Sequence, residues 1–140
     1  MQGITPATVP PPFGRYSHAT MVPPGWRMLR TSGQLGLELS GTVPPDVEGQ
    51  SRICFRHIDR ILAEAGMTSA DVAHITAWLV DRADLAAYMR CRDAFVGPSE
   101  RLPASTALIV SGFTRPEFRV EIEVMACAPQ VTLPPPPNPV

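Results

Sequence analysis

The chain of 140 residues is long enough for one compact core and too short for two ordinary domains. Hydrophobic residues make up 44% of it and charged residues 18%, which is the balance of a folded globular protein. The formal net charge of −1 provides no basic face for nucleic acid, and the complete lack of lysine excludes Schiff-base and pyridoxal-phosphate chemistry.

The residues that commonly bind metals are spread widely along the chain. Cys54, Cys91 and Cys127 share no short spacing and lie in apolar stretches, which is typical of buried, reduced thiols in a cytosolic protein. No His, Cys or carboxylate cluster has the spacing of a zinc or iron site, so we expect no metal. No stretch approaches the ~20 apolar residues of a membrane span, and the first residues lack the features of a signal peptide. We therefore expect a cytoplasmic protein without a membrane partner.

Prolines gather at both ends of the chain, from Pro6 to Pro12 and from Pro134 to Pro139. Such runs favour extended segments that cannot pair in a sheet or continue a helix. The sequence therefore predicts tails at residues 1–12 and 129–140 around one domain at residues 13–128. A proline-rich tail can also be a docking ligand for a partner domain.

Two short runs rich in β-forming residues open the domain, at residues 15–22 and 27–33. The turn sequence between them, Pro23-Pro24-Gly25, predicts that they form a hairpin. From Asp46 to Ala65 apolar residues recur at three- and four-residue spacing, which indicates an amphipathic helix that ends at Gly66.

The next run, residues 72–80, is apolar on both alternations and predicts a strand that is covered on both faces. A second helix is predicted at residues 83–96, with Gly97 after its end. We expect its inward residues to be Leu85, Ala86, Met89 and Phe95.

Two further strands are predicted, at residues 106–110 and 118–126. The resulting order, β-β-α-β-α-β-β, predicts an α+β fold in which a mixed sheet of four to six strands carries both helices on one face. The second of these strands alternates strictly between apolar and polar residues.

If the helices cover the apolar side of that last strand, Glu121 and Glu123 face the opposite side, together with Trp78 or Leu79. A half-apolar sheet face with a few carboxylates is typical of a subunit interface that holds a polar pocket. The alternative is an ordinary exposed strand of a monomer.

Several segments resemble those of one known family. Residues 13–19 (FGRYSHA) resemble the GPYSQA segment of the Rid/YjgF family, and residues 31–34 (TSGQ) resemble its VSGQ segment. The likeness continues in further segments. Residues 50–66 resemble the family's first helix, and residues 71–81 resemble its strand DVVKVTVFLTD. Residues 103–106 and 120–123 resemble its PARST…IEIE ending. The agreement of separated motifs over roughly residues 12 to 128 makes the resemblance specific.

The resemblance implies a chorismate-mutase-like α+β fold and a homotrimer whose sheets form a central barrel with three intersubunit clefts. The family members best known for activity hydrolyse reactive enamines and imines, such as 2-aminoacrylate, without a metal or organic cofactor. In them the arginine of the PARST motif binds the substrate carboxylate, and the first Glu of IEIE positions a water molecule.

This sequence matches some of the family's site residues. Glu121 stands at the position of the water-binding glutamate, and the pocket positions of the family are matched at four further residues: Tyr16, Ser32, Gly33 and Thr106.

It departs from the family at two site positions. The arginine is missing from Pro103-Ala104-Ser105-Thr106, and Met89 replaces a polar Asn on the second helix. Because Ala104 cannot replace a planar bidentate clamp, a substrate of the 2-aminoacrylate type loses its anchor. Substitute guanidinium groups could come from Arg101, Arg115 or Arg119.

Three functions stay open. The first is hydrolysis or tautomerisation of a small enamine, imine or enol, in which Glu121 moves the proton and Thr106, with backbone N–H groups near Gly33, holds the developing oxyanion. The second is a non-catalytic trimer that binds a small metabolite or a partner protein. The third, ribonuclease activity attributed to some relatives, is least favoured because the chain offers no basic groove.

Overall fold

The structure is a computed structural model that describes residues 1–130. A five-stranded sheet has the order β3-β7-β5-β6, and β4 adds to β7 beside β3. The strands of this sheet are β3 (Arg27–Arg30), β4 (Gln34–Leu35), β5 (Val72–Leu79), β6 (Ala104–Ile109) and β7 (Val120–Ala128). β5 and β6 run parallel, and the other pairs are antiparallel.

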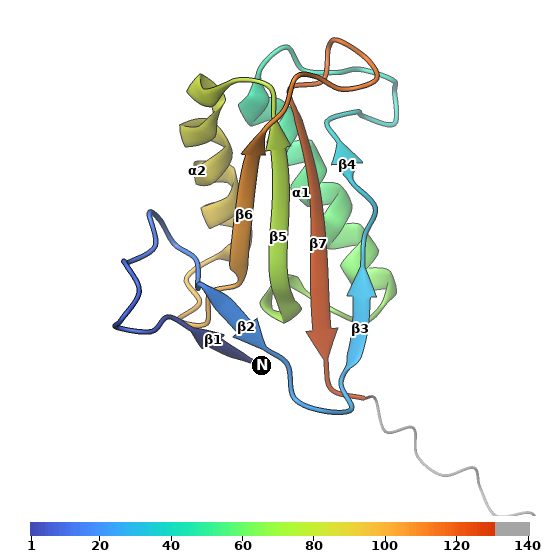
Figure 1. The fold of residues 1–140 in the computed structure, drawn as a ribbon. Coiled ribbons are helices and arrows are strands. Elements are labelled where there is room, and N and C mark those ends of the chain that lie inside the picture. Colours follow the sequence, from blue (N-terminus) through green and yellow to red (C-terminus); the bar gives the residue numbers. More distant parts are fainter. Residues whose placement is uncertain (131–140) are drawn as a thin grey trace, which may run out of the picture.

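Both long helices, α1 (Val47–Glu64) and α2 (Leu85–Val96), lie behind the sheet in Figure 1, and the front face carries no helix. Single 3₁₀ turns precede β5 at Ser69–Asp71 and α2 at Arg82–Asp84. The predicted α+β fold, a mixed sheet with two helices on one face, is confirmed.

The core lies between the sheet and the two helices. Side chains alternate along β5 and β7, and those that point toward the helices are buried. Ile58 and Leu62 of α1 and Tyr88 of α2 pack against these strand residues. The buried strand residues are Ile75, Ala77, Leu79, Val120, Ile122 and Val124. Because this side of β5 and β7 is used for the core, Trp78 and Glu121 lie on the other face, opposite each other across the two strands.

The predicted caps of α1 are present. Asp46 is the N-cap residue, and its carboxylate accepts a hydrogen bond from the backbone N–H of Gly49 at 2.8 Å. At the other end Gly66 has φ +60°, the left-handed conformation that glycine adopts without steric cost.

Gln50 joins α1 to the segment that leads into β7. Its side chain is fully buried, and its Nε2 donates to the carbonyl oxygens of Pro44 and Glu117 at 2.7 and 2.8 Å. Its Oε1 accepts from the backbone N–H of Arg119 at 2.8 Å. Gly36, which follows β4, packs against the backbone and the aliphatic part of Gln50 with no room for a Cβ.

The predicted hairpin between the first two β-rich runs is wrong. β2 (Ala19–Met21) pairs with β1 (Gln2–Ile4), and β3 pairs with β7. Pro23 and Pro24 have no N–H to donate across a tight turn, and β7 offers β3 a ladder that is anchored on the core.

The prediction of an unpaired tail over residues 1–12 fails at Gln2–Ile4, which forms β1. The first proline is Pro6, so these earlier residues keep the N–H groups that pair with β2. Most of the predicted C-terminal tail, residues 131–140, lies outside the described residues.

The inward face of α2 also differs from the prediction. Ala86 is exposed, whereas Tyr88 and Arg92 are buried. These two residues are four positions apart and therefore lie on the same helix face, which turns toward β6.

The three cysteines are free and buried, as predicted. Burial raises the pKa of the Cys54 thiol to about 12, so this thiol stays protonated. Among residues 1–130 no helix is long and apolar enough to cross a membrane.

Candidate functional site

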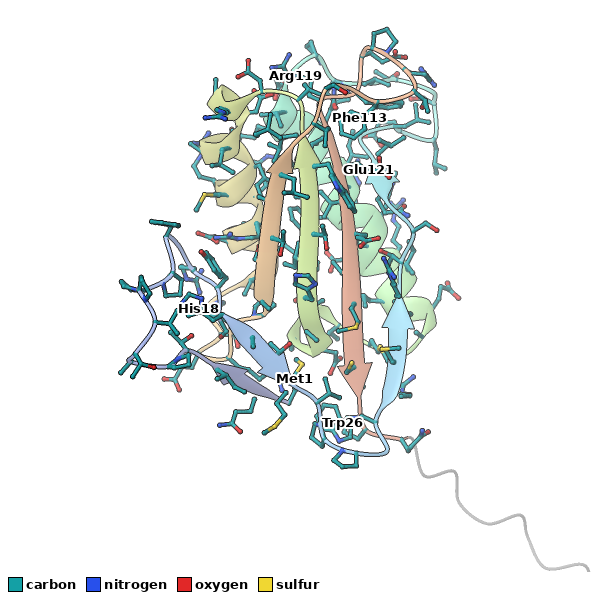
Figure 2. All side chains as sticks on the ribbon, in the orientation of Figure 1. Met1, His18, Trp26, Phe113, Arg119 and Glu121 are labelled. Atoms are coloured by element: carbon teal, nitrogen blue, oxygen red, sulfur yellow. The ribbon has the colours of Figure 1, made fainter. Side chains whose placement is uncertain are left out.

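The uncovered sheet face carries the predicted acidic residue. Glu121 lies on β7 opposite Trp78 of β5, and Leu35 of β4 pairs with it on the other side. Figure 2 shows Glu121 beside β4 on the front face of the sheet. A Cβ at Gly33 would lie 1.8 Å from Oε1 of Glu121, so the carboxylate packs directly on the glycine backbone. Ser32, next to Gly33, is exposed.

The two glutamates of β7 differ in their partners. Glu123 forms an ion pair with Arg30 at 3.2 Å. The half-buried carboxylate of Glu121 makes no hydrogen bond and no ion pair with the residues that the structure describes. Glu121 is therefore the carboxylate of this face that is available to a water molecule or a ligand.

Thr106 lies on the same face but away from Glu121. Its hydroxyl is 3.3 Å from Nε2 of His74, and burial lowers the pKa of His74 from its ordinary value of 6.5. In the register of the sheet, Thr106 of β6 is aligned with Glu123 of β7 rather than with Glu121, and β5 lies between β6 and β7. Two strand spacings amount to about 10 Å, so Thr106 and Glu121 of one chain do not contact the same small group.

The other predicted pocket residues gather at the far edge of the sheet. A cavity of about 190 Å³ lies between the segment before β2, helix α2 and strand β6. Two of the residues that line it are Tyr16 and Met89. Its other lining residues are Phe13, Leu85, Tyr88, Arg92, Ser105 and Ala107.

Alternation along β6 decides which residues reach this cavity. Ser105 and Ala107 point toward α2, whereas Ala104 and Thr106 point to the uncovered face with β5 residues His74 and Thr76. Within one chain, Thr106 and Ala104 therefore do not line the cavity that holds Tyr16, because successive strand residues face opposite sides.

Arg92 brings a charge into the cavity that the sequence did not lead us to expect. It is 3% exposed, and its Nε and Nη2 donate to one carboxylate oxygen of Asp93 at 3.0 and 2.7 Å. The guanidinium carbon lies 5.8 Å from the centre of the Tyr16 ring. Tyr88 is fully buried beside it, and its hydroxyl has no hydrogen-bond partner among residues 1–130.

The arginines considered as substitutes for the family's clamp are engaged elsewhere. Arg101 donates to the carbonyl oxygen of Ala70, and Arg115 pairs with Glu117. Arg119 pairs with Asp84 at 2.7 Å and lies at the upper end of β7 in Figure 2.

The site residues thus form two separate groups. One group, Gly33 and Glu121, lies at the β3/β4 edge of the sheet, and the other, the cavity with Tyr16 and Arg92, lies at the β6 edge. In a sheet ordered β3-β7-β5-β6 these edges face away from each other. No group of three or more His, Cys, Asp or Glu side chains within residues 1–130 could hold a metal ion.

Comparison with known proteins agrees with the fold. The family model described as Endoribonuclease L-PSP matches residues 7–128. A RutC family protein of Pyrococcus abyssi is 30% identical over 119 residues, which are 84% of this chain and 89% of that protein. A crystal structure from Yersinia pestis, a protein of unknown function of the conserved Rid protein family, has a TM-score of 0.80 and 30% identity, and the match covers 91% of this chain and 98% of that one.

The chain therefore belongs to the Rid/YjgF family, whose model carries the description Endoribonuclease L-PSP. Its relatives include proteins named as deaminases. One of them, the 2-iminobutanoate/2-iminopropanoate deaminase of Escherichia coli, is 29% identical over 101 residues, which are 71% of this chain and 78% of that protein.

Proposed function

We propose that this protein is a homotrimeric hydrolase that deaminates a small reactive imine or enamine in clefts between its subunits, with Glu121 activating the water molecule. The observation that carries the proposal is the half-buried Glu121 carboxylate, which packs on Gly33 and has no partner among the described residues. The deaminase named among the relatives supports the reaction class.

The surface of the monomer supports the assembly. β6 is an edge strand without a charged residue or a proline, and its Leu108 and Ile109 are 49% and 43% exposed. Bare apolar edge strands are uncommon on soluble monomers because they invite further pairing. A neighbouring copy that packs its β3/β4 edge near this region would bring Glu121 to the cavity with Tyr16. A contact between two different surfaces closes into a ring when the rotation between neighbouring copies allows it, and the family resemblance implies three copies.

The chemistry needs one base and a site that keeps bulk water out. Glu121 takes a proton from a water molecule while the oxygen of that water attacks the imine carbon, which gives a carbinolamine. The nitrogen then receives a proton and leaves as ammonia, and the remaining hydroxyl loses its proton to give the ketone. An enamine first takes up a proton on carbon and then follows the same course.

The substrate is anchored differently from 2-aminoacrylate in the active relatives. The family's arginine is missing from the start of β6, and Ser105 and Ala107 are the β6 residues that line the cavity. Met89 and Leu85 make the adjacent wall apolar. Backbone N–H groups near Gly33 hold the developing oxyanion, whereas Thr106 is paired with His74 and contributes to the subunit contact.

Glu121→Gln tests the proposal. Imines are generated in place by an amino-acid oxidase from aliphatic and aromatic amino acids, and ammonia release is compared with a blank without the protein. We expect the wild-type protein to accelerate release and Glu121→Gln to lose about a hundredfold of that rate or more. Glu123→Gln, two residues along the same face, is the matched control and keeps the rate. Equal rates for wild type and Glu121→Gln would contradict the proposal.

A second candidate function is a non-catalytic trimer that binds a small metabolite. The observation in its favour is the lost arginine at Ala104-Ser105, the residue that clamps substrate in the active relatives. The same assay separates the two: this candidate predicts ammonia release at the blank rate with every imine in the panel, while the ligand still raises the melting temperature.

A further inference from the structure

The cavity beside α2 contains a buried positive charge that its partner leaves partly free. Asp93 engages Nε and Nη2 of Arg92 through a single oxygen. Nη1 makes no hydrogen bond with the described residues, and a guanidinium carries five N–H donors. Arg92 can therefore donate to a ligand without giving up Asp93.

A second donor points to the same place. The Tyr88 hydroxyl is buried in the cavity wall, where it lies near the Ser105 hydroxyl and makes no well-formed hydrogen bond with residues 1–130; such groups are rare in folded proteins. Burial raises the pKa of Tyr88 to about 12, although the charge of Arg92 and the hydroxyl of Ser105 oppose this, so the hydroxyl keeps its proton and can donate it. An acceptor atom in the cavity would satisfy both groups at once.

We propose that Arg92 is the anion-binding residue of this protein and that, with the hydroxyls of Tyr88 and Ser105, it binds the carboxylate of a small organic monoanion. The apolar part of the ligand lies on Met89 and Leu85, and the Tyr16 ring borders both parts. This inference rests on the proposed function, for which it names the substrate class: a carboxylate held from the helix rather than from strand β6.

The charge balance selects a carboxylate over a phosphate. Asp93 already neutralises part of the Arg92 charge, and within residues 1–130 no other cationic side chain lines the cavity. A dianion would therefore lack compensation there, whereas a monoanion fits one shared guanidinium. The volume of about 190 Å³ limits the enclosed part of the ligand to a few carbon atoms beyond the carboxylate.

Binding of a stable keto acid tests the inference in the intact protein. The probes are 2-oxobutanoate, its uncharged amide and inorganic phosphate, and the measurement is isothermal titration calorimetry. We expect wild-type protein to bind the keto acid at least about tenfold more tightly than the amide or phosphate. Equal binding of the acid and the amide, or tighter binding of phosphate, would overturn the inference.

Variants assign the effect to Arg92. Arg92→Met should weaken keto-acid binding about tenfold or more and leave amide binding unchanged. Arg90→Met, which removes an exposed arginine of the same helix, is the control and should bind like wild type. Because Arg92→Met leaves Asp93 without its partner, the double variant Arg92→Met/Asp93→Asn is measured as well, and it should show the same loss.

Tyr88→Phe separates ligand binding from folding. It removes only a hydroxyl that has no partner, so the melting temperature should not fall, whereas keto-acid affinity should drop several-fold. Undiminished affinity in both Arg92→Met and Tyr88→Phe would refute the assignment.

These measurements do not depend on turnover. Glu121→Gln should bind 2-oxobutanoate no more weakly than wild type, because the variant removes a negative charge that repels the ligand carboxylate. Loss of ammonia release in Glu121→Gln with unchanged binding in Arg92→Met would leave the proposed function standing and remove this inference. Arg92-dependent binding without any imine hydrolysis would support this inference and contradict the proposed function.

Discussion

Gly33 is the residue on which the position of Glu121 depends. Its Cα lies so close to the carboxylate that an added methyl group would overlap Oε1. We predict that Gly33→Ala displaces the Glu121 side chain and lowers the rate of imine hydrolysis about as strongly as Glu121→Gln. Ser32→Ala, at the exposed neighbour, serves as the control. A wild-type rate in Gly33→Ala would show that Glu121 does not act from this position.

His74 makes stability depend on pH. Burial lowers its pKa in the folded protein, so the unfolded chain binds a proton more readily below about pH 6.5. Stability contributed by neutral His74 is therefore present above that pH and is lost as the pH falls. Urea unfolding between pH 5 and 7.5 should show a flatter pH dependence for His74→Asn than for wild type; an unchanged slope would contradict this. His57, whose pKa is also lowered by burial, accounts for part of the remaining slope.

At the residue scale the sequence predicted the position of Glu121 on the uncovered face but missed Arg92. An arginine within a helix is usually solvated, and nothing in one sequence tells how deeply its face is covered. The available signal was the spacing of Leu85, Tyr88 and Arg92, which places the arginine on the apolar face. The neighbours that bury it come from β6 and from the segment before β2, far away in sequence.

At the scale of elements, Gln50 couples α1 to β7. Replacing it by Leu would leave the carbonyl groups of Pro44 and Glu117 and the N–H of Arg119 without their partner. We predict a loss of about 2–4 kcal/mol in the free energy of unfolding, measured by urea titration. Gln34→Leu, whose amide contacts only nearby backbone carbonyls, should cost clearly less. A cost for Gln50→Leu no larger than that of Gln34→Leu would contradict this role.

Periodicity predicted the long elements well and the short ones poorly. The helix expected at residues 46–65 is α1 at Val47–Glu64, because its apolar spacing and Asp46 cap are local signals. The predicted hairpin failed because strands of three or four residues carry too little pattern to identify a partner. β1 was missed because it has only three residues and because the prolines that follow it predict an extended tail.

At the scale of the whole molecule, the exposed edge strand predicts assembly. Leu108→Arg places a charge on the apolar edge of β6 and should convert the proposed trimer to monomers in light scattering after size-exclusion chromatography. Leu39→Arg is the matched control, because Leu39 is 94% exposed in the loop after β4. A monomeric wild type, or a trimeric Leu108→Arg, would contradict the proposed contact.

The division of the site between the two sheet edges could not be predicted from periodicity. The alternating pattern of β7 indicates that Glu121 lies on the uncovered face, but strand order decides which side chains approach it. Only the order β3-β7-β5-β6 reveals that Glu121 and the Arg92 cavity lie toward opposite edges, which is why the proposed cleft needs a second copy.

Mixing two impaired variants tests whether the site is shared between subunits. Glu121→Gln keeps the cavity intact, and Arg92→Met keeps the base intact, so a mixed ring contains interfaces that join the two intact halves. When the variants are co-expressed in equal amounts, we predict recovery of about a quarter of the wild-type rate of ammonia release, because about one interface in four combines both intact halves. A rate no higher than the average of the two variants measured alone would contradict a site shared between subunits.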